Sequence, residues 1–158
     1  MATMVGTQHN VVDLLNQLIL LDFDAIEAYR TAVMKIKDEM ARSQLAQFMA
    51  DHERHVHELS ALVEGMGARP PRGPDMKQIL TKGKVFIGAL LGDRAILLAM
   101  KTNENDTNRA YERAASRTDV PQPVHDAFAR GLADERRHRA WIEDRLAARP
   151  IHAQTPPR

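Results

Sequence analysis

Two short stretches of the chain carry residue types that bind metal ions, and the two stretches resemble each other. Residues 51–55 read DHERH and residues 134–138 read DERRH, so the second follows the first at an offset of 83 residues (134 − 51). Residues three apart on a helix point to the same side, so each stretch can direct two ligands toward one point. The aligned pairs are Asp51 with Asp134, His52 with Glu135, Arg54 with Arg137, and His55 with His138.

Four amphipathic helices are expected to position these residues. Apolar residues recur every three or four positions in four segments, which is the pattern of a helix with one buried face. These segments are residues 11–36, 45–66, 90–115 and 124–146. Polar residues interrupt the apolar stripes near the middle, and they are Asp22 in the first, His52 and His55 in the second, Glu104 in the third, and Glu135 and His138 in the fourth.

The chain is organised as two similar helical hairpins. The first and third helices align at an offset of 82 residues (104 − 22), which pairs Asp22 with Glu104 and Tyr29 with Tyr111. The hairpins are expected over residues 11–67 and 85–148. The third helix is expected from about residue 85 to 116, with room for an interruption at Gly92. Two hairpins with apolar stripes bury each other as a four-helix bundle, so we predict an all-α fold.

The remaining segments are expected to be irregular. Gly65 and Gly67 end the second helix, and residues 68–84, rich in proline, glycine and basic residues, form a long crossover connection between the hairpins. Residues 1–10 are predicted to be a flexible N-terminus and residues 149–158, with three prolines, a disordered tail.

Composition limits the function classes. The chain has 158 residues, a formal net charge of +1 and no cysteine, which excludes disulfides, thiol catalysis and zinc–thiolate sites. We see neither a signal peptide nor an apolar run near the roughly 20 residues that span a bilayer, so we expect a soluble, cytoplasmic protein without a membrane partner. The arginines of the fourth helix alternate with acidic residues, which predicts a charged outer face rather than a nucleic-acid site.

Buried carboxylates need compensation, and the sequence allows two forms of it. One is a metal centre, because carboxylates and imidazoles suit iron and manganese, with zinc as a substitute. The other is a metal-free network of ion pairs, in which Lys101 could neutralise Glu104 one turn away.

Further residues are expected to support a metal centre. Asp51 is expected to accept a hydrogen bond from His138, and Asp134 from His55, because ligating histidines usually donate to a carboxylate. Tyr29 and Tyr111 are expected to donate hydrogen bonds to the ligands. On a shifted register of the first helix, Glu27 would replace Asp22 as a ligand.

Residues 20–29 (LLDFDAIEAY) and 48–55 (FMADHERH) resemble the small bacterial ferritin-like proteins of the di-iron carboxylate superfamily, often of unknown function. Residues 134–138 match the superfamily's Asp-Glu-x-x-His motif, whereas His52 stands in the place of the motif's glutamate. The resemblance implies a ferritin-like four-helix bundle with a dinuclear iron or manganese centre. Its implied ligands are Asp22, His52, His55, Glu104, Glu135 and His138.

The resemblance also implies a class of activity. It implies reduction of O₂ or peroxide in stress protection, while the residues alone leave open whether the chain is an enzyme. Metal ions are the expected partners. A homodimer through exposed helix faces is common in such bundles, and nothing in the sequence decides for or against it.

Overall fold

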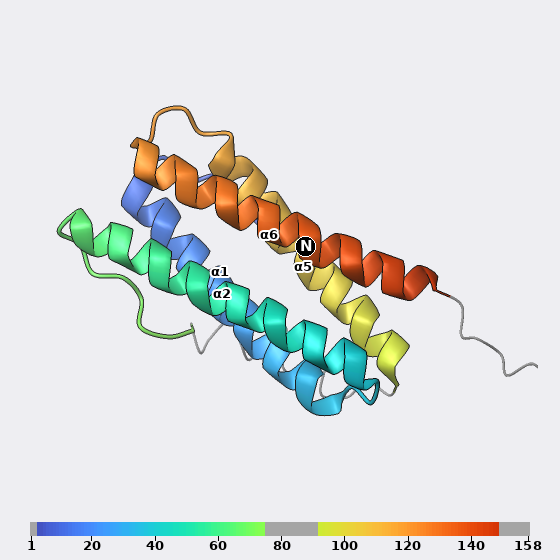
Figure 1. Ribbon diagram of the computed structural model, residues 1–158. Coiled ribbons are helices and arrows are strands. Elements are labelled where there is room, and N and C mark those ends of the chain that lie inside the picture. Colours follow the sequence, from blue (N-terminus) through green and yellow to red (C-terminus); the bar gives the residue numbers. More distant parts are fainter. Residues whose placement is uncertain (1–2, 75–91, 149–158) are drawn as a thin grey trace, which may run out of the picture.

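The computed structural model describes residues 3–74 and 92–148, which form a bundle of four long helices (Figure 1). The helices are α1 (Val11–Lys35), α2 (Glu39–Gly65), α5 (Asp93–Ala115) and α6 (Gln122–Ala147). The described residues contain no strand, and the predicted all-α fold is confirmed. None of the helices in this part of the chain is long and apolar enough to cross a membrane.

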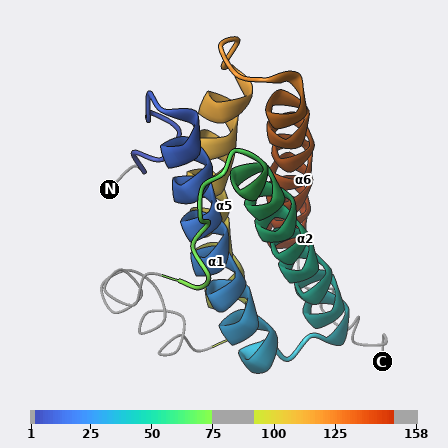
Figure 2. The same cartoon turned by 90° about the vertical axis from the view of Figure 1, so that its left-hand side faces the viewer.

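The helices pack as two antiparallel hairpins. α1 lies against α2 and α5 lies against α6, while α1 also contacts α5 and α2 contacts α6. The backbone N–H groups of Lys37 and Asp38 donate to the Asp93 carboxylate at 2.8 Å, so α1 ends where α5 begins. α2 therefore ends and α5 begins at opposite ends of the bundle (Figure 2). Residues 75–84 of the predicted crossover connection lie outside the described residues.

Local sequence signals explain where the helices begin and end. The side chain of Asn10 accepts hydrogen bonds from the N–H groups of Val12 and Asp13 and caps α1. α2 ends as predicted at its glycines. Gly67 has a φ of +74° and its neighbour Ala68 donates to the Val63 carbonyl, which is the Schellman arrangement. α5 begins after Gly92, and the predicted helical residues before it lie outside the described residues.

The N-terminal residues 3–10 make contacts that the sequence analysis does not anticipate. Arg113 of α5 donates to the carbonyl oxygens of Thr3 and Val5, and Arg117 donates to those of Gln8 and His9. The predicted flexible lead-in is thus attached along the end of α5. The predicted tail from residue 149 lies outside the described residues.

The interior contains two apolar clusters, each with residues from all four helices. Leu18, Leu59 and Phe128 belong to one cluster, and Leu45 and Met100 belong to the other. The internal repeat aligns residues of one cluster with residues of the other, because Leu18 aligns with Met100 and Phe128 with Leu45. Between them lies a layer of buried polar residues.

Candidate metal centre

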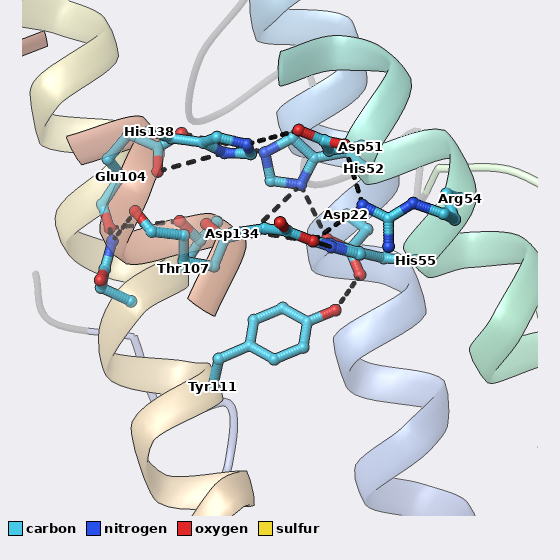
Figure 3. A network of polar contacts seen from close by, with 12 residues as sticks. Asp22, Asp51, His52, Arg54, His55, Glu104, Thr107, Tyr111, Asp134 and His138 are labelled. Atoms are coloured by element: carbon cyan, nitrogen blue, oxygen red, sulfur yellow. Dashed lines mark hydrogen bonds and ion pairs between the residues drawn. The ribbon is translucent and has the colours of Figure 1, made fainter. Parts of the chain in front are cut away.

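The buried polar layer contains all six predicted metal ligands. Figure 3 shows Asp22, His52, His55, Glu104 and His138 pointing toward one another. Five of them have no exposed surface, and they are Asp22, His52, Glu104, Glu135 and His138. His55 is 3% exposed. The apolar stripe of each helix turns these residues toward the bundle axis, so four separate helices present ligands at one level. Their role as ligands remains a prediction.

The six side chains form two overlapping groups of four. In each group one ligand atom per residue can be chosen so that all lie within 4.8 Å of one another. The first group is Asp22, His52, His55 and Glu135, and the second is His52, Glu104, Glu135 and His138. The shared members are His52 and Glu135. Two adjacent positions with shared ligands are the arrangement that a dinuclear centre requires.

Two aspartates orient the outer histidines. The Nε2 atom of His138 lies 2.9 Å from Asp51 Oδ2, and that of His55 lies 3.1 Å from Asp134 Oδ2. Each contact crosses between α2 and α6, as the sequence analysis predicts. Because Nε2–H donates outward, each ring presents Nδ1 to the centre, and this is the nitrogen a metal would bind.

Two arginines complete this outer layer. Arg54 donates to both Asp51 and Asp134 at 2.8 Å, and Arg137 contacts the same two carboxylates from α6. Burial would raise the pKa of Asp134, but its hydrogen bonds with His55 and Arg54 hold that pKa far below its usual value. The aspartates therefore stay ionised and remain hydrogen-bond acceptors. We missed this role of the arginines, although the repeat aligns Arg54 with Arg137.

The two tyrosines form hydrogen bonds that connect one hairpin to the other. Tyr29 of α1 donates to Glu104 Oε1 on α5, and Tyr111 of α5 donates to Asp22 Oδ2 on α1 at 2.7 Å. Both tyrosines were predicted to donate hydrogen bonds to metal ligands. In the structure, each donates to a carboxylate on the opposite hairpin. Each hydroxyl therefore occupies one carboxylate oxygen and restricts the rotation of that side chain.

Several polar atoms at the centre are buried without a hydrogen-bond partner. Among the described residues, six such atoms belong to the predicted ligands. They are His52 Nε2, His55 Nδ1, Glu104 Oε2, Glu135 Oε1, Glu135 Oε2 and His138 Nδ1. Buried polar atoms are nearly always paired, and an unsatisfied one costs about 1–3 kcal/mol. All six are types that bind iron, manganese or zinc, so the donor set fits such an ion.

Electrostatics at the centre favour retention of protons in the metal-free protein. Burial raises the pKa of Glu135 to about 8. Burial would lower the pKa of His52, but the charge of Glu135 and the hydrogen bond to Asp22 raise it well above its usual value. Burial lowers the pKa of His138 to about 4, so this ring stays neutral. A metal ion would displace the retained protons, and we therefore expect its affinity to rise with pH.

The metal-free protein is expected to lose a few kcal/mol of stability between pH 6.5 and pH 9. Burial would lower the pKa of His55, but the hydrogen bond to Asp134 and the nearby carboxylate of Asp22, 3.5 Å from Nδ1, raise it to about 9. The stabilising charge is complete below about pH 6.5, the unfolded value, and is lost as the pH passes 9. Glu135 also makes the protein less stable as the pH rises. The folded protein keeps Glu135 protonated until the pH nears 8, and loss of that proton leaves a buried charge. Urea unfolding at both pH values measures the loss.

A matched variant separates the two contributions. Glu135→Gln cannot ionise, so its stability should fall less over the same pH range than that of the natural protein. Equal stability of the natural protein at pH 6.5 and pH 9 would contradict the assigned charges.

The structure decides two alternatives that the sequence left open. Asp22 lies in the centre, whereas the side chain of Glu27, 17% exposed, forms an ion pair with Arg30 one turn along α1. Lys101 lies 3.2 Å from Glu143 on α6, so it pairs with that carboxylate instead of neutralising Glu104. The lysine is 38% exposed, because its position on α5 directs it away from the bundle axis.

Two buried residues near the centre were not predicted. The Nδ2 atom of Asn108 donates to the carbonyl oxygens of Glu104 and Glu135, at 2.8 and 2.9 Å, and so fixes α5 against α6 beside both carboxylates. Gly131 packs against the ring of Tyr111, and a Cβ there would lie 2.3 Å from the ring. The sequence could have indicated both roles, because Asn108 and Gly131 interrupt the apolar stripes of α5 and α6.

Three further arginines of α6 have carboxylate partners. Arg130 contacts Glu58 at 3.4 Å, and Arg136 contacts Glu112 at 3.5 Å. Arg145 contacts Asp38 at the start of α2. These pairs match the predicted charged outer face.

Comparison with solved structures identifies bundles with the same fold. The bacterioferritin-related protein of Bacteroides fragilis, a dodecameric thioferritin, is 15% identical and has a TM-score of 0.73, with 86% of this chain and 83% of that chain covered. The conserved hypothetical protein rv2844 of Mycobacterium tuberculosis is 13% identical, with a TM-score of 0.70 and coverage of 90% and 94%. Dps of Thermosynechococcus elongatus is 15% identical, with a TM-score of 0.61 and coverage of 88% and 92%. The chain therefore has the ferritin-like four-helix fold.

Comparison with protein families gives one match. The profile of the domain of unknown function DUF2383 matches residues 10–117, which include α1, α2 and α5. No curated protein matches the sequence. The chain belongs to the DUF2383 family.

Proposed function

We propose that this member of the DUF2383 family binds two divalent metal ions, iron or manganese, between its four helices. The ligands would be the six residues of the buried polar layer, with Glu135 shared between the ions. When bound, such ions supply electrons for the reduction of O₂ or peroxide, so we propose an oxidoreductase or stress-protection role. The ferritin-like neighbours support iron as the first metal to test.

The observation that carries this proposal is the set of six buried ligand atoms that lack a hydrogen bond and lie no closer than 3.5 Å to an oppositely charged group. They come from α2, α5 and α6 and converge on two overlapping groups of ligands. A metal-free network of ion pairs, the alternative reading, would be expected to satisfy these atoms internally. In the structure, both oxygens of Glu135 lack a hydrogen bond, and the side chain has no exposed surface.

The surrounding residues would hold the ligands in place before an ion arrives. Asp51 and Asp134 fix the rings of His138 and His55 with Nδ1 inward. Tyr29 fixes one oxygen of Glu104. The apolar clusters above and below the layer exclude water, which strengthens every electrostatic interaction within it.

We expect about two equivalents of iron or manganese per chain, measured by plasma mass spectrometry on protein purified without chelator or affinity metal. The double variant Glu135→Ala, His138→Ala removes a shared carboxylate and an imidazole, and it should contain almost none. Loss of a ligand leaves too few donors for either ion. Circular dichroism would confirm that the variant is folded.

The redox part of the proposal has its own test. Protein loaded with Fe²⁺ under anaerobic conditions should oxidise the iron faster on addition of O₂ or peroxide than the double variant mixed with the same Fe²⁺. Equal rates would leave a metal-binding protein without this activity. Absence of metal from both proteins, even after anaerobic reconstitution, would reject the metal centre and favour a structural bundle.

A further inference from the structure

The two halves of the centre differ, and the difference originates at His52. The repeat aligns His52 of α2 with Glu135 of α6. A carboxylate offers two equivalent oxygens and can contact two ions, whereas an imidazole binds an ion through one nitrogen. His52 can therefore be a ligand in only one half of the centre.

Hydrogen bonding assigns the ring of His52 to the half that contains Glu104. Its Nδ1 atom lies 2.9 Å from Asp22 Oδ1, and the ring N–H donates because the carboxylate only accepts. Its Nε2 atom has no hydrogen-bond partner and lies 3.8 Å from Glu104 Oε1. The nitrogen that is available to a cation thus faces Glu104.

The carboxylate oxygens show the same imbalance. Both oxygens of Asp22 are occupied, Oδ1 by His52 at 2.9 Å and Oδ2 by Tyr111 at 2.7 Å. Glu104 gives only Oε1 to Tyr29 and keeps Oε2 unpaired, 3.8 Å from His138 Nδ1. A cation beside Glu104 finds a free oxygen, whereas a cation beside Asp22 has to displace an existing hydrogen bond.

We propose that the centre consists of two unequal cation sites that fill in a fixed order. The tight site is formed by His52 Nε2, Glu104, Glu135 and His138, and the weak site by Asp22, His55 and Glu135. The inference rests on the proposed metal-binding function. The two sites share Glu135, whose oxygens are both free of hydrogen bonds. The tight site has four donors, including the free Oε2 of Glu104, whereas the weak site has three, and both oxygens of Asp22 are already occupied.

Titration of metal-free protein with Mn²⁺ tests the order of filling. The electron paramagnetic resonance signal of free Mn²⁺ reports how much ion remains unbound at each step. We expect one equivalent to bind at least about tenfold more tightly than the second, the scale on which loss of a supporting contact weakens metal binding.

Two isosteric variants assign the sites. Glu104→Gln should weaken the first equivalent by about 10- to 100-fold. Asp22→Asn should remove the second equivalent and weaken the first less than Glu104→Gln does, because the amide oxygen of asparagine can still accept from His52 Nδ1. His52→Glu supplies a fourth carboxylate that can contact both ions, so it should bring the second affinity close to the first. Circular dichroism of each variant verifies the fold.

The outcomes separate this inference from the proposed function. Failure of the natural protein to bind any Mn²⁺ would reject the metal centre itself. Two equivalents of equal affinity would overturn only the inequality. Loss of the tight equivalent in Asp22→Asn, with the tight equivalent intact in Glu104→Gln, would overturn the assignment of the halves.

Discussion

Saturating Mn²⁺ is expected to raise the unfolding temperature of the metal-free protein by about 8–16 °C. A ligand at 1,000 times its dissociation constant stabilises the folded state by about 4 kcal/mol. Each kcal/mol shifts the midpoint by about 2–4 °C in a domain of this size. The physical source is the pairing of buried atoms, above all both oxygens of Glu135, that have no hydrogen bond without the ion. Thermal unfolding followed by circular dichroism, with and without Mn²⁺, measures the shift.

Glu135→Leu should reverse this behaviour. Replacing an unpaired buried carboxyl with an apolar side chain of similar volume should stabilise the metal-free protein by about 1–3 kcal/mol. The same variant should lose the response to Mn²⁺, because the shared carboxylate is gone. Glu143→Gln, an exposed change on the same helix, is the matched control and should keep the full response. A Glu135→Leu protein that still gains stability from Mn²⁺ would show that Glu135 is not a ligand.

Gly131→Ala is expected to destabilise the protein by about 1–3 kcal/mol, the usual cost of overpacking a core. The new Cβ would lie 2.3 Å from Tyr111 Cε1, within a ring that is 1% exposed. The ring has to move, and its 2.7 Å hydrogen bond to Asp22 is lost with it. The higher helix propensity of alanine offsets only about 1 kcal/mol. Urea unfolding of the metal-free proteins measures the difference.

Two further variants isolate the cause. Gly65→Ala changes a helical glycine with no heavy atom within 4 Å of the added Cβ, so it should be neutral or slightly stabilising. In a Tyr111→Ala background the ring is absent, and Gly131→Ala should then cost little. A similar cost of Gly131→Ala with and without the ring would contradict the proposed clash.

The amino-acid sequence by itself determined the helices and the kinds of residue at the centre. The period of apolar residues located α1 and α6 to within about two residues at each end and placed Glu104 in the third helix. It located the end of α2, but α2 begins at Glu39, six residues before the predicted segment 45–66. It also placed Asp22, His55 and His138 on buried faces, because burial of one face is a property of each helix alone. The tendency of ligating histidines to donate to a carboxylate further predicted that Asp51 and His138 meet across α2 and α6.

Only the tertiary structure decided how residues of different helices combine. The crossed bonds from Tyr29 to Glu104 and from Tyr111 to Asp22 depend on how one hairpin is placed on the other. The same is true of the division of the two nitrogens of His52 between Asp22 and Glu104. A helical period states which face of a helix is buried, but not which neighbour that face meets, because that choice depends on the packing of both hairpins together.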